Sequence, residues 1–248
     1  MIEVRDLQKS FGAQKILDGV SFRIENGESV AIIGRSGGGK SVLLKHLIGL
    51  LQPDAGDVLV DGESIVAMEE RQLLRVRRKF GMVFQGAALF DSMTVAENVA
   101  FAFRRHKNVT AGEIAKRVAA ALEMVDLPGT ENKKPAELSG GMRKRVGLAR
   151  AIIYEPQIIL YDEPTTGLDP IVSDSIDKLI IRVRDHLKVT SIVVTHDMRS
   201  ARRVGNHVLM LHETKLYANC TPEALFASQD PVVRQFVDGV ADAKENLF

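Results

Sequence analysis

Gly34 to Ser41 carry the residue types most suggestive of chemistry, because they fit the spacing G-x-x-x-x-G-K-[S/T] in full. Glycines allow successive backbone N–H groups to turn toward phosphate oxygens, which larger side chains would obstruct. Lys40 would bring positive charge to the β- and γ-phosphates, and Ser41 would offer its hydroxyl to Mg²⁺. With ordinary glycine usage, the spacing arises by chance in on the order of one chain in a hundred of this size. It therefore predicts a site for a nucleoside triphosphate.

A pair of carboxylates follows a second apolar run. Ile158 to Tyr161 is largely apolar, and Asp162 and Glu163 come directly after it. Ligands of open α/β sheets bind at the carboxyl ends of the strands, so both carboxylates would lie near a bound nucleotide. Asp162 would hold Mg²⁺, directly or through water, and Glu163 would orient or deprotonate the attacking water. Without the glycine loop, such a pair is more often a solvated strand end or a helix cap.

The elements around these residues have the pattern of an α/β fold. Ser29 to Gly34 is a continuous apolar run, typical of a buried parallel strand. Ser41 to Leu51 has the pattern of a helix that ends before Pro53. From Leu138 onward helical and strand patterns alternate, with a helix expected from Arg143 to Tyr154. This alternation indicates a parallel sheet with helices on both faces.

Composition and charge exclude several classes of protein. With 33 basic and 32 acidic residues, the chain has no net field that would attract nucleic acid. The main basic run, Arg71 to Lys79, lacks interleaved aromatic residues, and we interpret it as a solvated helix face. The single cysteine, Cys220, excludes a disulfide framework. Neither a signal peptide nor the roughly 18 apolar residues of a membrane span is recognisable, so we expect a cytoplasmic protein without a nucleic-acid partner.

Leu138 to Met142, which reads Leu-Ser-Gly-Gly-Met, lies between the two nucleotide motifs and resembles the signature sequence of the ATP-binding cassette (ABC) ATPases. Glycines that precede a helix again offer backbone N–H groups to an anion. In that family the signature faces the γ-phosphate bound to the opposite subunit. The resemblance therefore implies a homodimer that closes over two ATP molecules. Met142 stands where the family most commonly has glutamine, which leaves the glycine geometry intact and removes a polar contact.

The same resemblance gives roles to further positions. Phe11 stands where the family has an aromatic residue that stacks on adenine, and Gln85 matches the glutamine that reaches Mg²⁺ and the attacking water. Gly167 to Asp169 resembles the loop that communicates across the dimer, and His196 matches the histidine that contacts the γ-phosphate. Taken alone, each of these residues is more often structural. Their combination with the two nucleotide motifs favours function.

Three sets of candidate site residues follow for an ATPase that uses ATP and Mg²⁺. The catalytic set is Lys40, Gln85, Glu163 and His196, and the metal set is Ser41, Gln85 and Asp162. The nucleotide-binding set is Phe11, Gly34, Ser36, Gly37, Gly38, Gly39, Lys40, Ser41, Ser139, Gly140, Gly141 and Asp169.

The resemblance implies an α/β fold, a P-loop NTPase core with a mostly parallel sheet, an N-terminal antiparallel β subdomain and an inserted α-helical subdomain. We expect residues 1–248 to form a single ABC ATPase domain, whose nucleotide-binding core comprises 1–89 and 138–221. The helical subdomain would occupy about 90–137, where the pattern from Thr94 to about Leu127 is helical. Residues 222–248 would form a C-terminal helical appendage.

Phe84 to Val99 bears on the substrate. It resembles the Q-x-G-A-L-F…M-T-V-x-E-N-V stretch of the Mla/Mce-type lipid transporter ATPases, and Asp230 to Gly239 resembles the close of those proteins. The resemblance implies transport of phospholipid or another hydrophobic molecule between membranes. The implied partners are a polytopic permease that docks near residues 85–105 and an MCE-type lipid-binding protein, with the ATPase peripheral on the inner face of the cell membrane. Small residues from Gly86 to Ala88 would leave a groove for a partner helix, although packing within the helical insert is the alternative.

Two other functions remain open at this point. An importer ATPase for polar amino acids shares a similar L-F…M-T-V-x-E-N-V stretch, and a cassette ATPase can also relay force to a division or cell-wall apparatus. The nucleotide motifs do not separate these functions from lipid transport.

Overall fold

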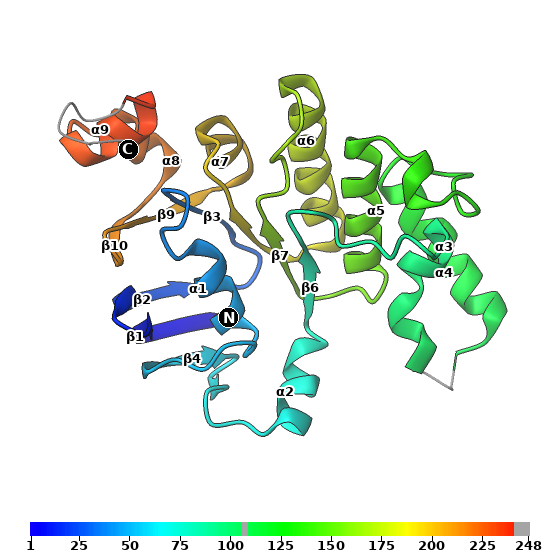
Figure 1. The fold of residues 1–248 in the computed structure, drawn as a ribbon, viewed down its shortest axis with the longest axis horizontal. Coiled ribbons are helices and arrows are strands. Elements are labelled where there is room, and N and C mark those ends of the chain that lie inside the picture. The colour runs from blue at the N-terminus through cyan, green and yellow to red at the C-terminus, as the bar shows by residue number, and fades with distance from the viewer. Residues whose placement is uncertain (106–108, 241–248) are drawn as a thin grey trace.

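Two β-sheets organise the molecule, whose computed structural model describes residues 1–105 and 109–240 (Figure 1). An antiparallel sheet has the order β2-β1-β4-β5, and a larger sheet has the order β10-β9-β3-β8-β7-β6. In the larger sheet β6, β7, β8, β3 and β9 run parallel, and β10 pairs antiparallel with β9. The predicted fold class is confirmed. The strands are β1 (Ile2–Phe11), β2 (Gln14–Ile24), β3 (Ser29–Gly34), β4 (Ala55–Val60), β5 (Glu63–Ser64), β6 (Phe80–Val83), β7 (Ile158–Asp162), β8 (Thr190–Val194), β9 (His207–His212) and β10 (Lys215–Cys220).

Helices surround the larger sheet. Figure 1 shows α3, α4 and α5 gathered beyond β6, and α8 and α9 at the opposite end near β9 and β10. None of the helices in the described ranges is long and apolar enough to cross a membrane. The α-helices are α1 (Lys40–Leu47), α2 (Glu70–Arg77), α3 (Val95–Val99), α4 (Ala111–Met124), α5 (Gly140–Ile152), α6 (Pro170–Leu187), α7 (Met198–Val204), α8 (Pro222–Ala227) and α9 (Pro231–Asp238), and the short 3₁₀ helices are η1 (Phe101–Arg105) and η2 (Pro135–Glu137).

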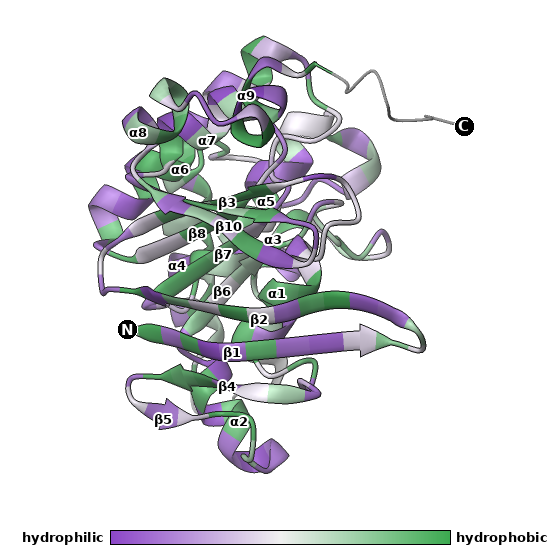
Figure 2. Cartoon of the chain, turned by 90° about the vertical axis from the view of Figure 1, so that its left-hand side faces the viewer, coloured by the Kyte–Doolittle hydropathy of each residue, from purple (hydrophilic) through white to green (hydrophobic). Residues whose placement is uncertain are grey.

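The buried side chains of the larger sheet form separate clusters on its two faces. Successive side chains of a strand point to opposite faces. Ile32 of β3 and Leu160 of β7 face the antiparallel sheet and share a buried cluster with Leu44 of α1. Ile33 and Tyr161, one residue further along, face the helices on the other side. Helix α1 therefore lies between the two sheets, as Figure 2 shows, and its buried side chains fix the helix at which the preceding loop ends.

Two helices differ from the sequence-based expectation at their ends. Helix α1 stops at Leu47 rather than at Leu51, because Gly49 adopts a left-handed backbone with φ 63°. Helix α5 begins at Gly140, three residues before the expected start at Arg143. The Ser139 hydroxyl accepts a hydrogen bond from the Met142 N–H at 3.2 Å, which caps the helix at that point.

Helices also form in the described parts of the predicted helical subdomain and of the predicted C-terminal appendage, whose bounds stay a prediction. Helix α4 buries Val118 and Ala121, as its 3.6-residue period predicts. Helix α9 places Val233 against Ile33 and Met210 of the larger sheet. Residues 106–108 of the predicted helical subdomain and 241–248 of the predicted appendage lie outside the described residues.

Candidate nucleotide-hydrolysis site

The loop between β3 and α1 depends on glycine at both ends. A Cβ on Gly34 would lie 2.6 Å from the backbone oxygen of Leu211, closer than real Cβ contacts come. Gly39 precedes α1 with φ 89°, a left-handed conformation that costs glycine little. Helix α1 begins directly afterwards at Lys40. The backbone therefore turns tightly into a helix N-terminus, which is the arrangement that binds phosphate.

Lys40 lies beneath this loop. Its side chain is buried, and its ammonium donates hydrogen bonds to the carbonyl oxygens of Gly34 at 2.8 Å and Arg35 at 2.9 Å. Glu163 Oε1 lies 3.8 Å from the same nitrogen. Burial lowers the pKa of Lys40 from its ordinary value, while the negative charges of Glu163 and Asp162 act in the opposite direction. The ammonium is thus held at the centre of the loop.

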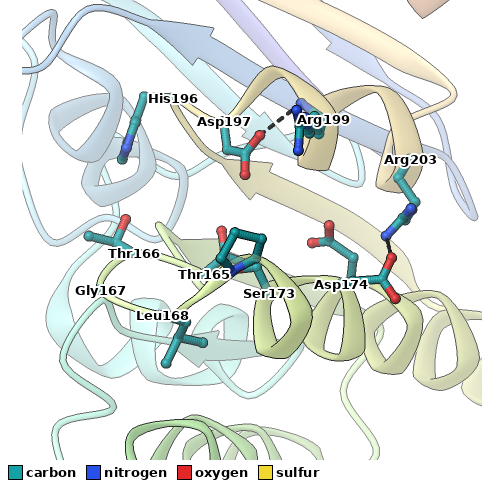
Figure 3. A pocket seen from close by; sticks show the side chains of 12 residues that line it. Thr165, Thr166, Gly167, Leu168, Ser173, Asp174, His196, Asp197, Arg199 and Arg203 are labelled. Carbon is teal, nitrogen blue, oxygen red and sulfur yellow. Dashed lines mark hydrogen bonds and ion pairs between the residues drawn. The ribbon is translucent and has the colours of Figure 1, made fainter.

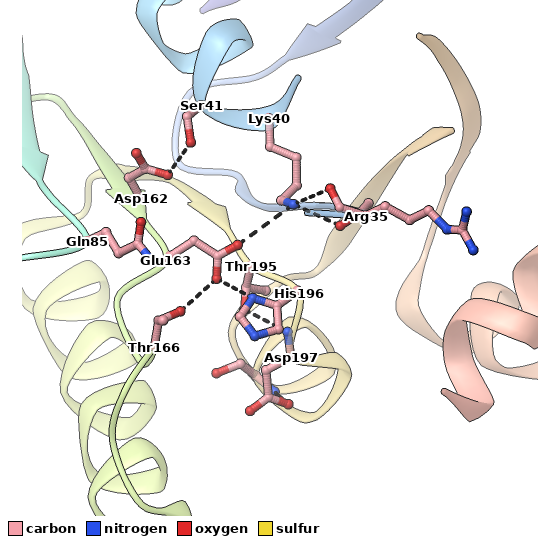
Figure 4. Close-up of polar contacts among 12 residues, drawn as sticks. Arg35, Lys40, Ser41, Gln85, Asp162, Glu163, Thr166, Thr195, His196 and Asp197 are labelled. Carbon is pink, nitrogen blue, oxygen red and sulfur yellow. Dashed lines mark hydrogen bonds and ion pairs between the residues drawn. The ribbon is translucent and has the colours of Figure 1, made fainter. Parts of the chain in front are cut away.

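Three side chains and one backbone hydrogen bond fix Glu163 (Figure 4). Its backbone has φ 49°, unusual for a residue with a side chain, and its N–H donates to the Val194 carbonyl at 2.9 Å. Its Oε2 accepts from the Thr166 hydroxyl at 2.9 Å and lies 2.6 Å from His196 Nδ1. With Lys40 near its other oxygen, the carboxylate has one defined orientation.

Ser41 and Asp162 form an oxygen pair beside Glu163. The Ser41 hydroxyl donates to Asp162 Oδ1 at 2.9 Å, although the two residues come from α1 and the end of β7. A hydroxyl and a carboxylate are the hard oxygen donors that Mg²⁺ prefers. The donor set therefore fits the predicted metal.

Lys40, Ser41 and Glu163 line one cavity of about 390 Å³. Asp162 is not part of its lining and is joined to it through the hydroxyl of Ser41. Gln85, at the carboxyl end of β6, also lines it, so that four strand or helix ends meet there (Figure 4). Its lining residues are Ser36, Gly37, Gly39, Lys40, Ser41, Val42, Gln85, Glu163, Thr166 and His196. Gly38 holds the turn itself, since its N–H donates to the Arg35 carbonyl at 2.9 Å.

A neighbouring cavity of about 420 Å³ shares only Thr166 and His196 with the first (Figure 3). It is lined by the Thr165–Leu168 loop, by α6 and by α7, including Asp174, Arg199 and Arg203. Lys40 and Ser41 do not line it, so its larger volume does not make it the candidate phosphate site.

The signature residues lie outside the Lys40 cavity. Ser139 caps α5, and a Cβ on Gly141 would lie 2.7 Å from Val172 of α6. Asp169 caps α6, because its Oδ1 accepts hydrogen bonds from two backbone N–H groups of that helix, at 2.9 and 3.0 Å. The signature turn thus packs on the start of α6. Its expected role, facing a nucleotide held by a second copy, stays a prediction.

Phe11 is at the end of β1 with half of its surface exposed. Its ring centroid lies 5.6 Å from the Lys9 ammonium, and the ring does not line the Lys40 cavity. The expected stacking of this ring on adenine stays a prediction.

The segment from Phe84 to Phe90, called here the docking segment, does not present three small residues to a groove. Ala87 is buried against Gly147 of α5, with 3.3 Å between Ala87 Cβ and a Cβ built on Gly147. The Arg150 guanidinium donates to the carbonyls of Ala87 and Ala88, both at 2.6 Å. The alternative of packing within the molecule therefore holds for Ala87, while Phe90 keeps an exposed ring.

Sequence reasoning missed three residues of this region. Thr166 holds the Glu163 carboxylate, Arg150 holds the docking segment, and Lys144 donates to the carbonyls of Gln85 and Glu163. Arg150 and Lys144 are basic residues in a helix. Because such side chains are usually exposed to solvent, their residue types did not indicate a role at this site.

The arrangement agrees with comparisons to known proteins. A family model described as ABC transporter matches residues 17–166. The chain is 44% identical to the probable ribonucleotide transport ATP-binding protein mkl of Mycobacterium leprae, over 96% of this chain and 69% of that protein. It is 41% identical to the intermembrane phospholipid transport system ATP-binding protein MlaF of Escherichia coli K12, over 98% of this chain and 90% of that protein.

A solved structure gives the same picture. The ATP-binding cassette MJ0796, in a dimeric post-hydrolysis state bound to ADP and Pi, superposes with a TM-score of 0.81 and 33% identity, covering 90% of this chain and 99% of that chain. From its glycine loop, its paired carboxylates and these relatives, the chain belongs to the ABC transporter family of ATPases.

Proposed function

We propose that this chain is the ATP-hydrolysing subunit of an ABC transporter that moves phospholipid or another hydrophobic molecule between membranes. The observation that carries the hydrolytic part is the Glu163 carboxylate, buried and held between Lys40, Thr166 and His196 in one cavity. A carboxylate fixed in this way, beside a phosphate-binding loop, can act on a water molecule rather than serve as a solvated strand end.

Each residue of the site would have a different role in ATP hydrolysis. Lys40 and the backbone N–H groups of the loop would bind the β- and γ-phosphates and stabilise the charge that develops on them. Glu163 would accept the proton of the attacking water, and His196 would orient Glu163 through its Nδ1–H. Ser41 and Asp162 would hold Mg²⁺, with Gln85 beside them. The ion would neutralise phosphate charge when bound.

We propose a homodimer in which Ser139 to Gly141 of one copy complete the site of the other. Ile171, at the start of α6 beside Asp169, is 82% exposed, and a second copy that packs on the signature turn would cover it. MJ0796 is described as a dimeric cassette. The first nucleotide half-site and the signature would then come from different copies.

The permease would dock near residues 85–105. Phe90, the last residue of the docking segment, and Phe101 expose part of their rings, whose centroids are 4.4 Å apart. Exposed aromatic pairs of this kind are common anchors at interfaces. The chain would therefore be peripheral on the cytoplasmic face of the membrane, with an MCE-type lipid-binding protein in the same complex and no nucleic acid.

The names of the relatives bear on the substrate. MlaF is named for phospholipid transport and mkl for ribonucleotide transport. We favour a lipid because the stretches Phe84 to Val99 and Asp230 to Gly239 both resemble lipid transporter ATPases.

The proposal is tested by a pull-down of the tagged chain from detergent-solubilised membranes of its own cell, with protein and lipid mass spectrometry. The expected result is a stoichiometric permease with an MCE-domain protein and phospholipid, and their loss in the matched variant Phe90→Asp. A permease for a polar solute, or a ribonucleotide in place of lipid, would contradict the lipid assignment.

A further inference from the structure

Lys144 is a buried cation whose two hydrogen bonds go to backbone oxygens. Only 8% of its surface is exposed. Its ammonium donates to the carbonyl oxygen of Gln85 and, at 3.4 Å, to that of Glu163. Burial lowers the pKa of Lys144 from its ordinary value, and the charges of Glu163 and Asp162 oppose that effect. An apolar side chain would fill this space without the cost of burying a charge, so packing alone does not explain a lysine here.

The two carbonyls belong to the two segments that would couple permease docking to ATP hydrolysis. Gln85 follows β6 and is the second residue of the docking segment, and Glu163 follows β7. These strands are neighbours in the sheet, with Val83 paired to Tyr161. Lys144 comes from neither strand but from α5, the helix that begins at the signature glycines. One ammonium therefore joins the signature helix, the docking segment and the backbone of the hydrolytic carboxylate.

Helix α5 contacts the docking segment through two further residues. Gly147 lies against Ala87, and Arg150 donates to the carbonyls of Ala87 and Ala88. Helix α5 and the docking segment would consequently move as one body. Of the contacts described for α5, the bond from Lys144 is the one that reaches Glu163.

We propose that Lys144 is a positioning residue, which transmits the position of the docking segment to Glu163 through its two carbonyl bonds. This inference rests on the proposed function, since it takes Glu163 as the group that acts on water. A partner that pulls on the docking segment would shift the Glu163 backbone through Lys144, and so would switch hydrolysis without touching the nucleotide.

The test uses the purified full-length chain and its variants Lys144→Met, Lys144→Arg and Arg150→Met. Amide hydrogen exchange is measured over residues 84–90 and 161–166, together with kcat and KM for ATP. Arg150→Met is the matched control, because it releases the docking segment from the same helix without touching the Glu163 backbone. Lys144→Arg keeps donors that can reach both carbonyls.

In Lys144→Met, the amides of residues 84–90 and 161–166 should exchange faster than in the wild type. Its kcat should fall about tenfold and its KM for ATP should stay within about threefold of the wild type, as expected when a positioning contact is lost. Arg150→Met should exchange faster over 84–90 alone and keep kcat within threefold of the wild type. Lys144→Arg should restore both readouts. If Lys144→Met does not fold, Lys144→Gln, whose shorter amide reaches at most one carbonyl, carries the same expectation.

Unchanged exchange over 161–166 in Lys144→Met, or an equal loss of kcat in Arg150→Met, would overturn the inference. Glu163→Gln is measured in parallel to keep the two proposals separate. Normal hydrolysis by Glu163→Gln would remove the assigned role of Glu163, whereas normal exchange and kcat in Lys144→Met alone would remove only the role of Lys144.

Discussion

His196 Nδ1 lies 2.6 Å from Oε2 of Glu163, so the end of β8 and the end of β7 are joined by one side-chain hydrogen bond. The imidazole is half exposed, while the carboxylate is buried. His196 thus closes the cavity from its open side and holds the inner group in place. Through this contact with Glu163, His196 would have its proposed role in hydrolysis even without touching phosphate.

His196→Ala should therefore lower kcat by about a hundredfold while the KM for ATP changes little, because a misplaced catalytic group costs rate rather than binding. The measurement is steady-state phosphate release over a range of ATP concentrations. His196→Gln, which can still donate to Glu163, should recover part of the rate. An increase in KM with an unchanged kcat would instead indicate that His196 serves nucleotide binding alone.

Lys40→Ala should lose nucleotide binding. The ammonium holds the carbonyls of Gly34 and Arg35 and is the cation placed under the phosphate loop. Equilibrium binding of a fluorescent ATP analogue should weaken by about a hundredfold, which corresponds to about 2.7 kcal/mol. Lys45→Ala, in the last turn of the same helix, is the matched control and should bind like the wild type. Equal affinity of Lys40→Ala and the control would place the phosphates elsewhere.

Asp177 predicts a dependence of stability on pH. It is buried on α6 beside the cavity of Figure 3 and accepts a hydrogen bond from Ser200 of α7. Burial raises its pKa from 3.8 to about 6, with the charge of Asp197 adding to the effect and the Ser200 bond opposing it. Because folding raises this pKa, the stabilising contribution is present below about pH 4 and is lost as the pH rises through about 6.

Asp177→Asn keeps an acceptor for Ser200 and removes the buried charge. Its free energy of unfolding should exceed that of the wild type by up to about 3 kcal/mol at pH 8, and the two should nearly coincide at pH 4. Urea denaturation at both pH values measures the difference. A gain of the same size at both values would show that the carboxylate does not titrate as described.

The sequence predicted which candidate site residues lie close together, because local chemistry places them. The glycine loop needs its residue types for a backbone turn. Asp162 ends β7 and Glu163 follows it, and the parallel sheet places the end of that strand near the loop. The contacts of Ser41 with Asp162 and of Glu163 with His196 then follow from strand order.

Short strands, edge strands and contacts between residues distant in sequence could not be predicted in the same way. Strand β6 has only four residues and contains Gly81, so its pattern is too brief to recognise, and β10 alternates exposed and half-buried residues at the sheet edge. Ala87 is buried because Gly147 of a distant helix leaves room for it, which no local pattern reveals. Lys144 was missed for the same reason, since its partners lie 59 and 19 residues away.

Glu163→Gln tests the central claim most directly, because it removes the acid–base group and keeps the size of the side chain. Phosphate release is compared with the wild type, and the molar mass is measured by light scattering with ATP and with ADP. We predict that hydrolysis falls by about a hundredfold or more, in the range expected for loss of a general base, and that ATP but not ADP holds the variant as a dimer. Hydrolysis at the wild-type rate would contradict the account.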